Sequence, residues 1–156
     1  MPMTPEQRLH ELGLEIPEIP PAVGNYVGAV RVGNILFVSG HGPFKDGAPT
    51  HIGKLGRDLT VEEGQQSARL VALNMLASIK AEIGELDRVA RVVKLLCLVN
   101  SDPEFGDQPK VANGASDLLV EIFCEERGKH ARSAIGMGAL PFGISVEIEG
   151  IFELKP

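Results

Sequence analysis

Two stretches of the chain place apolar residues at the three- and four-residue spacing of a helix with one buried face. The first runs from Ala68 to Ile83, follows the capping-box sequence Thr60-Val61-Glu62-Glu63 and stops before Gly84. The second runs from Ala115 to Phe123. We therefore predict two long helices, each of which buries one side. A third, short helix is predicted near the N-terminus, where Thr4 precedes a proline.

Other segments have the pattern of strands. Asn25 to Arg31 and Ile35 to Ser39 flank Gly33-Asn34, which is a strong signal for a two-residue hairpin turn. Val89 to Val99 is almost continuously apolar, and such a run predicts a strand that is buried on both faces. Residues 41–57 are rich in glycine and proline and have no periodicity, so they are predicted to form a long loop.

Two final strands are predicted at Arg132 to Gly138 and at Ile144 to Leu154, where apolar and polar residues alternate. If they form a hairpin with each other, Arg132 lies roughly opposite Glu149, and Glu147 is its diagonal neighbour. This pairing would place the arginine and both glutamates on the face of the sheet that points away from the helices.

The predicted order is helix, two strands, helix, strand, helix, two strands. This order indicates an α+β fold in which both long helices pack on one face of a mixed sheet. Residues 1–21 are interpreted as an N-terminal helix with a proline-rich extension, and residues 22–156 as the main domain. A chain of 156 residues fits one such domain better than two.

Composition narrows the possible functions. The formal net charge is −6, the aromatic fraction is 4% and there is a single tyrosine, so a nucleic-acid-binding protein is disfavoured. No apolar run is long enough to span a bilayer. Cys97 and Cys124 lie in apolar stretches and are expected to be buried thiols, which fits a reducing cytoplasm. The four histidines lack metal-ligand spacing, so no metal is expected. His51 and His130 are expected to be solvated loop residues.

The residues alone leave two interpretations of Arg132 and Glu147. The simpler one, which we favour on this evidence, is a solvated ion pair between strands that contributes little to stability. In the other, the small residues Ala134, Gly136 and Gly138 allow another subunit to approach this surface. Arg132 would then bind a small carboxylate through a bidentate pair of hydrogen bonds, and Glu147 would hold a water molecule or transfer a proton.

Four short stretches in a fixed order carry a family resemblance. They are Ala22-Val23-Gly24-Asn25-Tyr26, then Val38-Ser39-Gly40-His41, then Val111-Ala112-Asn113, and last Ala131-Arg132-Ser133-Ala134-Ile135 followed by Leu140-Pro141 and Val146-Glu147-Ile148-Glu149. In this order and spacing they resemble the Rid/YjgF family of reactive-intermediate deaminases, also described as endoribonuclease L-PSP-like. The resemblance spans most of the chain from Ala22 onward.

The resemblance implies a chorismate mutase-like fold, β-β-α-β-α-β-β, that assembles as a homotrimer with ligand clefts between subunits. It also implies hydrolysis of short-lived enamines and imines, such as 2-aminoacrylate, to 2-keto acids and ammonia. No cofactor is expected, and the expected ligand is a small imine or keto acid that carries a carboxylate.

The resemblance also assigns roles to residues by their position in the motifs. Arg132 would clamp the substrate carboxylate, and Glu147 would place or activate the attacking water. The cleft would also be lined by Tyr26, Ser39, the backbone of Gly40, His41, Asn113 and Ala134. Two of these depart from the family pattern, because His41 stands where glutamine is usual and Ala134 where many members have cysteine.

Two further functions stay open at this point. The same cleft would serve a non-catalytic protein that binds small carboxylates. The endoribonuclease name attached to relatives suggests RNA cleavage, against which the acidic composition and the single tyrosine argue.

Overall fold

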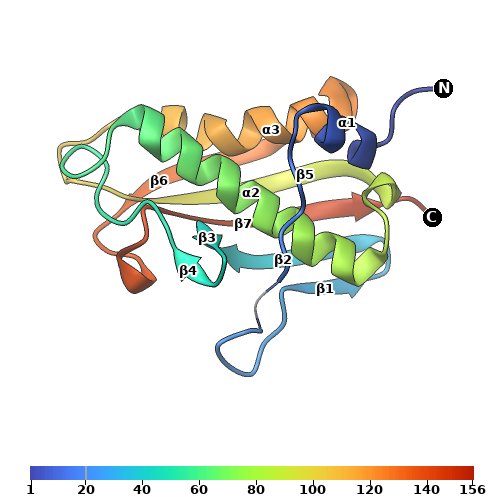
Figure 1. Cartoon of the computed structure of the whole chain (residues 1–156), viewed down its shortest axis with the longest axis horizontal. Helices are drawn as coiled ribbons and strands as arrows, with labels where there is room; N and C mark the ends of the chain where they lie inside the picture. Colours follow the sequence, from blue (N-terminus) through green and yellow to red (C-terminus); the bar gives the residue numbers. More distant parts are fainter. Residues whose placement is uncertain (20) are drawn as a thin grey trace.

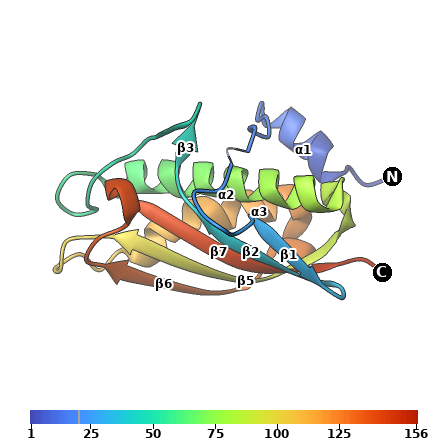
Figure 2. The same cartoon turned by 90° about the horizontal axis from the view of Figure 1, so that it is seen from below.

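The computed structural model describes residues 1–19 and 21–156 and shows two layers, a five-stranded sheet and a pair of long helices on one of its faces (Figures 1 and 2). The strand order in the sheet is β1-β2-β7-β5-β6. The strands are β1 (Ala29–Val32), β2 (Ile35–His41), β5 (Val89–Asn100), β6 (Ala131–Met137) and β7 (Val146–Leu154), and the helices are α2 (Val61–Ile83) and α3 (Gln108–Gly128). The α+β fold with both helices on one face of a mixed sheet is therefore confirmed.

Smaller elements complete the described part of the chain. Helix α1 (Pro5–Glu11) lies against α3, and its Leu9 is buried in the common core (Figure 1). The predicted loop 41–57 contains a short two-stranded ribbon of β3 (Phe44–Lys45) and β4 (Ala48–Pro49). Two 3-10 turns, η1 (Leu86–Arg88) and η2 (Pro141–Gly143), precede β5 and β7. Pro20, in the proline-rich extension, lies outside the described residues.

The helix ends follow from the local sequence. The Thr60 hydroxyl accepts a hydrogen bond from the Glu63 amide, and the Glu63 carboxylate accepts one from the Thr60 amide, each at 3.2 Å. This capping box satisfies backbone donors that the first turn of α2 leaves free. Gly84 ends the helix with a φ of 91°, a conformation that favours glycine. The predicted capping box at Thr60 and the predicted end before Gly84 are confirmed, and the helix begins at Val61, ahead of the periodic stretch that starts at Ala68.

The predicted hairpin of the last two strands is wrong. Strand β6 pairs in parallel with β5, whereas β7 lies between β2 and β5 and is antiparallel to both. In this register Leu95 of β5 separates Arg132 from Gly150, so Arg132 and Glu149 are not neighbours. The apolar strand β5 takes a place inside the sheet with a partner on each side, and this place prevents direct contact of β6 with β7.

The prediction that Arg132 lies on the face away from the helices is also wrong. Leu95 and Cys97 point toward the helices and are fully buried. Their parallel partners on β6, Arg132 and Ala134, lie on the same face. Glu147 on β7 lies on the opposite face, as its alternation with buried neighbours predicted.

Burial of β5 on both faces is not observed within the single chain. Its inward side chains are buried, but Leu96 and Leu98 on the other face are only partly covered. Figure 2 shows that the helices lie on one side of the sheet and that the other side is bare. Of the two cysteines, Cys97 is buried as expected, but Cys124 near the end of α3 is exposed.

Close packing of the two long helices depends on Gly114 of α3. A Cβ atom at this position would fall inside the contact distance of the backbone carbonyl of Gln65 on α2. A backbone atom cannot swing aside as a side chain can, so the two helices would have to separate.

We therefore expect Gly114→Ala to lower the free energy of unfolding by about 1–3 kcal/mol, the usual range for overpacking. Urea denaturation followed by circular dichroism measures it. Gly106→Ala is the matched control, because a Cβ there meets no atom within 4 Å. Equal stability of the two variants would contradict the interpretation.

Candidate functional site

Arg132 is held by three neutral acceptors on helix α3. Its Nη1 donates to Asn113 Oδ1 at 2.8 Å and to Ser116 Oγ at 3.1 Å, and its Nη2 donates to the Pro109 carbonyl at 3.3 Å. Among the residues that the structure describes, no carboxylate forms an ion pair with this half-buried guanidinium. Two of its five N–H groups donate to no described residue. Arg132 is therefore fixed in place and carries a positive charge without a partner.

The surroundings of Arg132 favour binding of an anion over covalent chemistry. Ala134, two residues along β6, packs against the core and leaves no polar side chain beside the arginine on that strand. The nearest thiol belongs to Cys97, and burial raises its pKa to about 11 despite the opposing influence of Arg132. A thiol with this pKa stays protonated near neutral pH and is a poor nucleophile.

A second group of predicted residues gathers around a bulge in β2. Val38 pairs with Gly150 and His41 with Ile148, so β2 has one more residue than β7 over this interval. The extra residue lies at Ser39 and Gly40. A Cβ atom on Gly40 would come within 2.5 Å of Glu147 Oε2, so only glycine lets this carboxylate lie against the strand.

The Glu147 carboxyl group is partly buried beside the bulge. Burial raises its pKa above the ordinary 4.5, and the charge of Glu149 adds to the rise. A raised pKa makes this carboxyl group a better proton acceptor than an ordinary glutamate, which suits a group that takes a proton from water and returns it.

The bulge also turns His41 away from Glu147. Its Nδ1 lies 2.5 Å from the Ser39 carbonyl oxygen and its Nε2 lies 2.6 Å from the buried Ser78 hydroxyl of α2. Burial lowers the pKa of this imidazole, although the contact with the Ser39 carbonyl opposes the effect. His41 therefore lies under α2, on the other face of the sheet from Glu147, and its role in a cleft stays a prediction.

Tyr26 is tied to the same bulge through the backbone. The Ser39 hydroxyl donates to the Val27 carbonyl at 2.6 Å, and the Ser39 amide donates to the Gly28 carbonyl at 2.9 Å. The Tyr26 side chain itself is 56% exposed. It has room to contact a ligand or another subunit.

The predicted residues thus form two groups that one chain does not bring together. The Arg132 group consists of Arg132, Asn113 and Ala134, and the Glu147 group consists of Glu147, Ser39, Gly40 and Tyr26. The first lies on the helix side at the edge strand β6, and the second lies at β2 and β7, with its carboxylate on the bare face of the sheet.

Two polar residues beside the Arg132 group were missed by the sequence reasoning. Ser116 bonds to Arg132, and His130, expected to be solvated, is half-buried with Nε2 at 2.9 Å from the Ser116 hydroxyl. The available signal was the helical spacing of Ser116 from Asn113, which puts both side chains on one face of α3.

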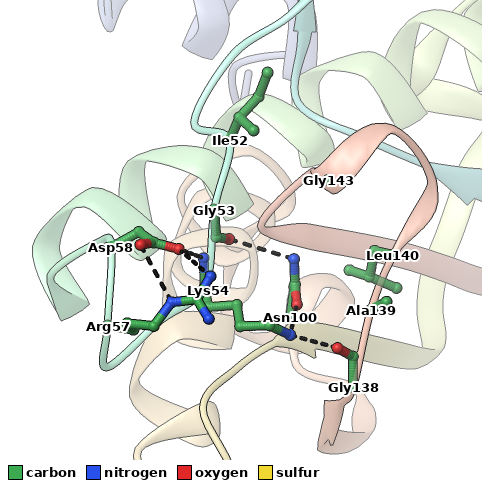
Figure 3. Close-up of a pocket in the computed structure, with 10 residues that line it drawn as sticks. All are labelled: Ile52, Gly53, Lys54, Arg57, Asp58, Asn100, Gly138, Ala139, Leu140 and Gly143. Atoms are coloured by element: carbon green, nitrogen blue, oxygen red, sulfur yellow. Dashed lines mark hydrogen bonds and ion pairs between the residues drawn. The ribbon is translucent and has the colours of Figure 1, made fainter.

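A surface pocket of about 610 Å³ lies elsewhere, where residues 52–58 meet the ends of β5 and β6 (Figure 3). The Lys54 ammonium donates to Asn100 Oδ1 at 2.8 Å and to the Gly138 carbonyl, and Asn100 is 4% exposed. None of the predicted site residues lines this pocket.

The described segments, residues 1–19 and 21–156, hold no cluster of three or more His, Cys, Asp or Glu side chains that could bind a metal ion. No helix in this part of the chain has the length and apolar character needed to cross a membrane.

Comparison with known proteins places this geometry in a family. Residues 6–148 match the family model described as "YjgF/chorismate_mutase-like, putative endoribonuclease". The chain belongs to this YjgF family. The match begins inside the segment 1–21, so the boundary drawn at residue 21 stays a prediction.

The relatives agree with this assignment. Protein TCP17 of Trypanosoma cruzi is 48% identical over 147 residues, which cover 94% of this chain and 92% of TCP17. Atu1372 from Agrobacterium tumefaciens, a protein of unknown function with a crystal structure, is 44% identical with a TM-score of 0.91, covering 97% of this chain and 92% of Atu1372. RidA from the Antarctic bacterium Psychrobacter is 28% identical with a TM-score of 0.59, covering 88% of this chain and 94% of RidA.

We expect Glu147→Gln to stabilise the YjgF-family fold at pH 7, because the variant removes a carboxylate that burial disfavours in its charged form. A raised pKa in the folded state means that the native carboxyl group favours folding below pH 4.5 and loses this advantage as the pH rises through its raised value. The difference from the native protein should therefore disappear below pH 4.5. Denaturation at a series of pH values measures it.

Glu153→Gln is the control for this experiment, since Glu153 lies on the same face of β7 and is exposed. A stability difference for Glu147→Gln that does not change with pH, or one equal to that of the control, would contradict the assigned burial of Glu147.

Proposed function

We propose that this protein is an enamine and imine deaminase that hydrolyses substrates of the 2-aminoacrylate type to 2-keto acids and ammonia. The observation that carries the proposal is Arg132, a fixed guanidinium that forms no ion pair with a described residue and has two N–H groups that donate to none of them. A small carboxylate matches these two donors in charge and in geometry. Membership of a family that includes a RidA protein agrees with it.

The active unit in this proposal is a homotrimer with a cleft at each subunit interface. The arrangement of the two groups supports a trimer. One chain does not bring them together, so the Arg132 group of one chain needs the Glu147 group of another chain to complete a site. The bare face of the sheet also carries exposed apolar side chains that suit contact with a second copy. They are Val30, Val32, Phe37 and Ile135.

The chemistry in this cleft would need no cofactor. Arg132 binds the carboxylate of the imine, which places its C2 atom toward Glu147 of the adjoining subunit. Glu147 takes a proton from water as the water oxygen bonds to C2 and the C=N π electrons move to nitrogen. The proton then passes to the nitrogen of the carbinolamine. The C–N bond then breaks as Glu147 passes the remaining hydroxyl proton to the departing nitrogen, so ammonia leaves and the C=O bond of the keto acid forms.

Activity is tested with a dehydratase that releases 2-aminoacrylate, by comparing keto-acid formation with and without the purified protein. We expect Arg132→Ala to lower the rate about a hundredfold or more, because the substrate loses both its charge partner and its orientation. Arg57→Ala is the control, since Arg57 is exposed and its guanidinium forms an ion pair with its neighbour Asp58. No acceleration by the native protein above the uncatalysed rate would overturn the proposal.

The trimer has its own test. Phe37→Asp puts a charge on the bare face, where it would be desolvated in an interface. We expect analytical ultracentrifugation to show dissociation to monomers together with loss of activity. Ala81→Asp adds the same charge at an exposed position of α2 and should leave the trimer intact. A native protein that sediments as a monomer at micromolar concentration would contradict the trimer.

A second function uses the same Arg132 site without catalysis. A rise in the melting temperature with 2-oxobutyrate that survives Glu147→Gln, together with no turnover of any imine tested, would favour a carboxylate-binding protein over the deaminase. The endoribonuclease description of the family is the third possibility. Reproducible RNA cleavage that is lost in Arg132→Ala would support it.

A further inference from the structure

Behind Arg132 lies a chain of hydrogen bonds that the proposed deamination does not use. Arg132 Nη1 donates to Ser116 Oγ at 3.1 Å, and this hydroxyl is 2.9 Å from His130 Nε2. The other ring nitrogen, Nδ1, is 2.6 Å from the Gly128 carbonyl oxygen. Ser116 and Gly128 belong to α3, Arg132 belongs to β6, and His130 lies between the two elements. These hydrogen bonds therefore connect α3 to the start of β6.

The positions of the protons follow from which atoms can donate. The Gly128 carbonyl only accepts, so Nδ1 carries a proton whether the ring is neutral or charged. In the neutral ring Nε2 must then accept, and the Ser116 hydroxyl donates to it while accepting from Arg132. In the charged ring Nε2 donates to Ser116, whose own proton is released for another acceptor.

Burial and the charge of Arg132 both favour the neutral form of the His130 ring when no ligand is bound. Burial lowers its pKa from 6.5, the positive charge of Arg132 lowers it further, and only the Gly128 carbonyl opposes them. No carboxylate of the described residues contacts the ring. Of the charged groups nearby, Lys129 forms an ion pair with Glu125 at 3.3 Å, Asp117 on α3 is exposed, and Lys94 on the neighbouring strand β5 is exposed.

We propose that His130, acting through the Ser116 hydroxyl, positions Arg132 and takes up a proton when a carboxylate binds to it. The inference rests on the proposed carboxylate site and deepens it. A bound anion cancels the charge that disfavours the imidazolium, and the imidazolium in turn adds a second positive charge near the anion. By linkage, each event favours the other to the same extent.

The coupling determines the direction in which carboxylate affinity changes with pH. Because the anion raises the pKa of His130, the protein binds a carboxylate more tightly as the pH falls from 7.5 to 5.5. We expect a tightening of about fivefold or more over this range, at the lower end of typical coupling between sites. The carboxyl group of a 2-keto acid stays ionised throughout, so the ligand itself contributes no such change.

The experiment is calorimetric titration with 2-oxobutyrate at several pH values, in buffers that differ in ionisation enthalpy so that proton uptake is counted. All variants carry Glu147→Gln, which removes the other carboxyl group that would respond to pH. The expected result is net proton uptake and tighter binding at low pH. Both should be lost in His130→Gln, whose amide keeps a hydrogen-bonding group near Ser116. His10→Gln, at an exposed position of α1 away from both groups, is the control and should keep both.

The nitrogen-15 chemical shifts of the His130 ring provide a second test of its protonation state. They are measured in protein that keeps this histidine, so the test does not depend on a substitution at this position. They should show Nδ1 protonated in the free protein and a higher pKa with saturating 2-oxobutyrate. Binding with an unchanged pH profile in His130→Gln, or a ring pKa that the ligand does not raise, would overturn the role of His130. Failure of 2-oxobutyrate to bind at any pH would instead overturn the carboxylate site itself.

Discussion

The parallel pairing of β6 with β5 decides where the charge of Arg132 lies. The pairing places Arg132 beside the inward-facing Leu95, so the guanidinium points toward α3 and finds its three acceptors there. A shift of one residue in this register would turn the arginine to the bare face of the sheet and separate it from Asn113 and Ser116. The pre-positioned cation thus depends on a backbone pairing between strands far apart in the sequence.

The bulge at Ser39 and Gly40 positions the Glu147 group, as the pairing of β6 with β5 positions Arg132. It gives β2 one extra residue, places the Glu147 carboxylate against a glycine and turns His41 inward to Ser78. Both groups are therefore built from irregular or edge positions supported by a regular, well-packed core. Such positions leave polar side chains and backbone groups accessible, whereas the interior of the sheet is closed by apolar side chains.

Local features of the fold could be predicted from the sequence, and long-range ones could not. Thr60 and Gly84 mark the ends of α2 because caps depend on residues a few positions apart. The partner of β6 depends on competition among all strands for the apolar β5, and nearness in sequence wrongly favoured β7. His130 was misjudged for a similar reason, since its partner Ser116 lies on a preceding helix. Motif resemblance singled out Arg132 and Glu147 as candidates, but it carried no information about the faces on which they lie.

The placement of the two groups on opposite faces of one chain has a genetic consequence. In an assembly of the proposed kind, each cleft takes its arginine from one protomer and its glutamate from another. Two defective alleles, one lacking Arg132 and one lacking Glu147, would then produce mixed oligomers in which some clefts inherit both intact side chains. Interallelic complementation would follow from the geometry of the sheet alone, without any change in the stability of either polypeptide.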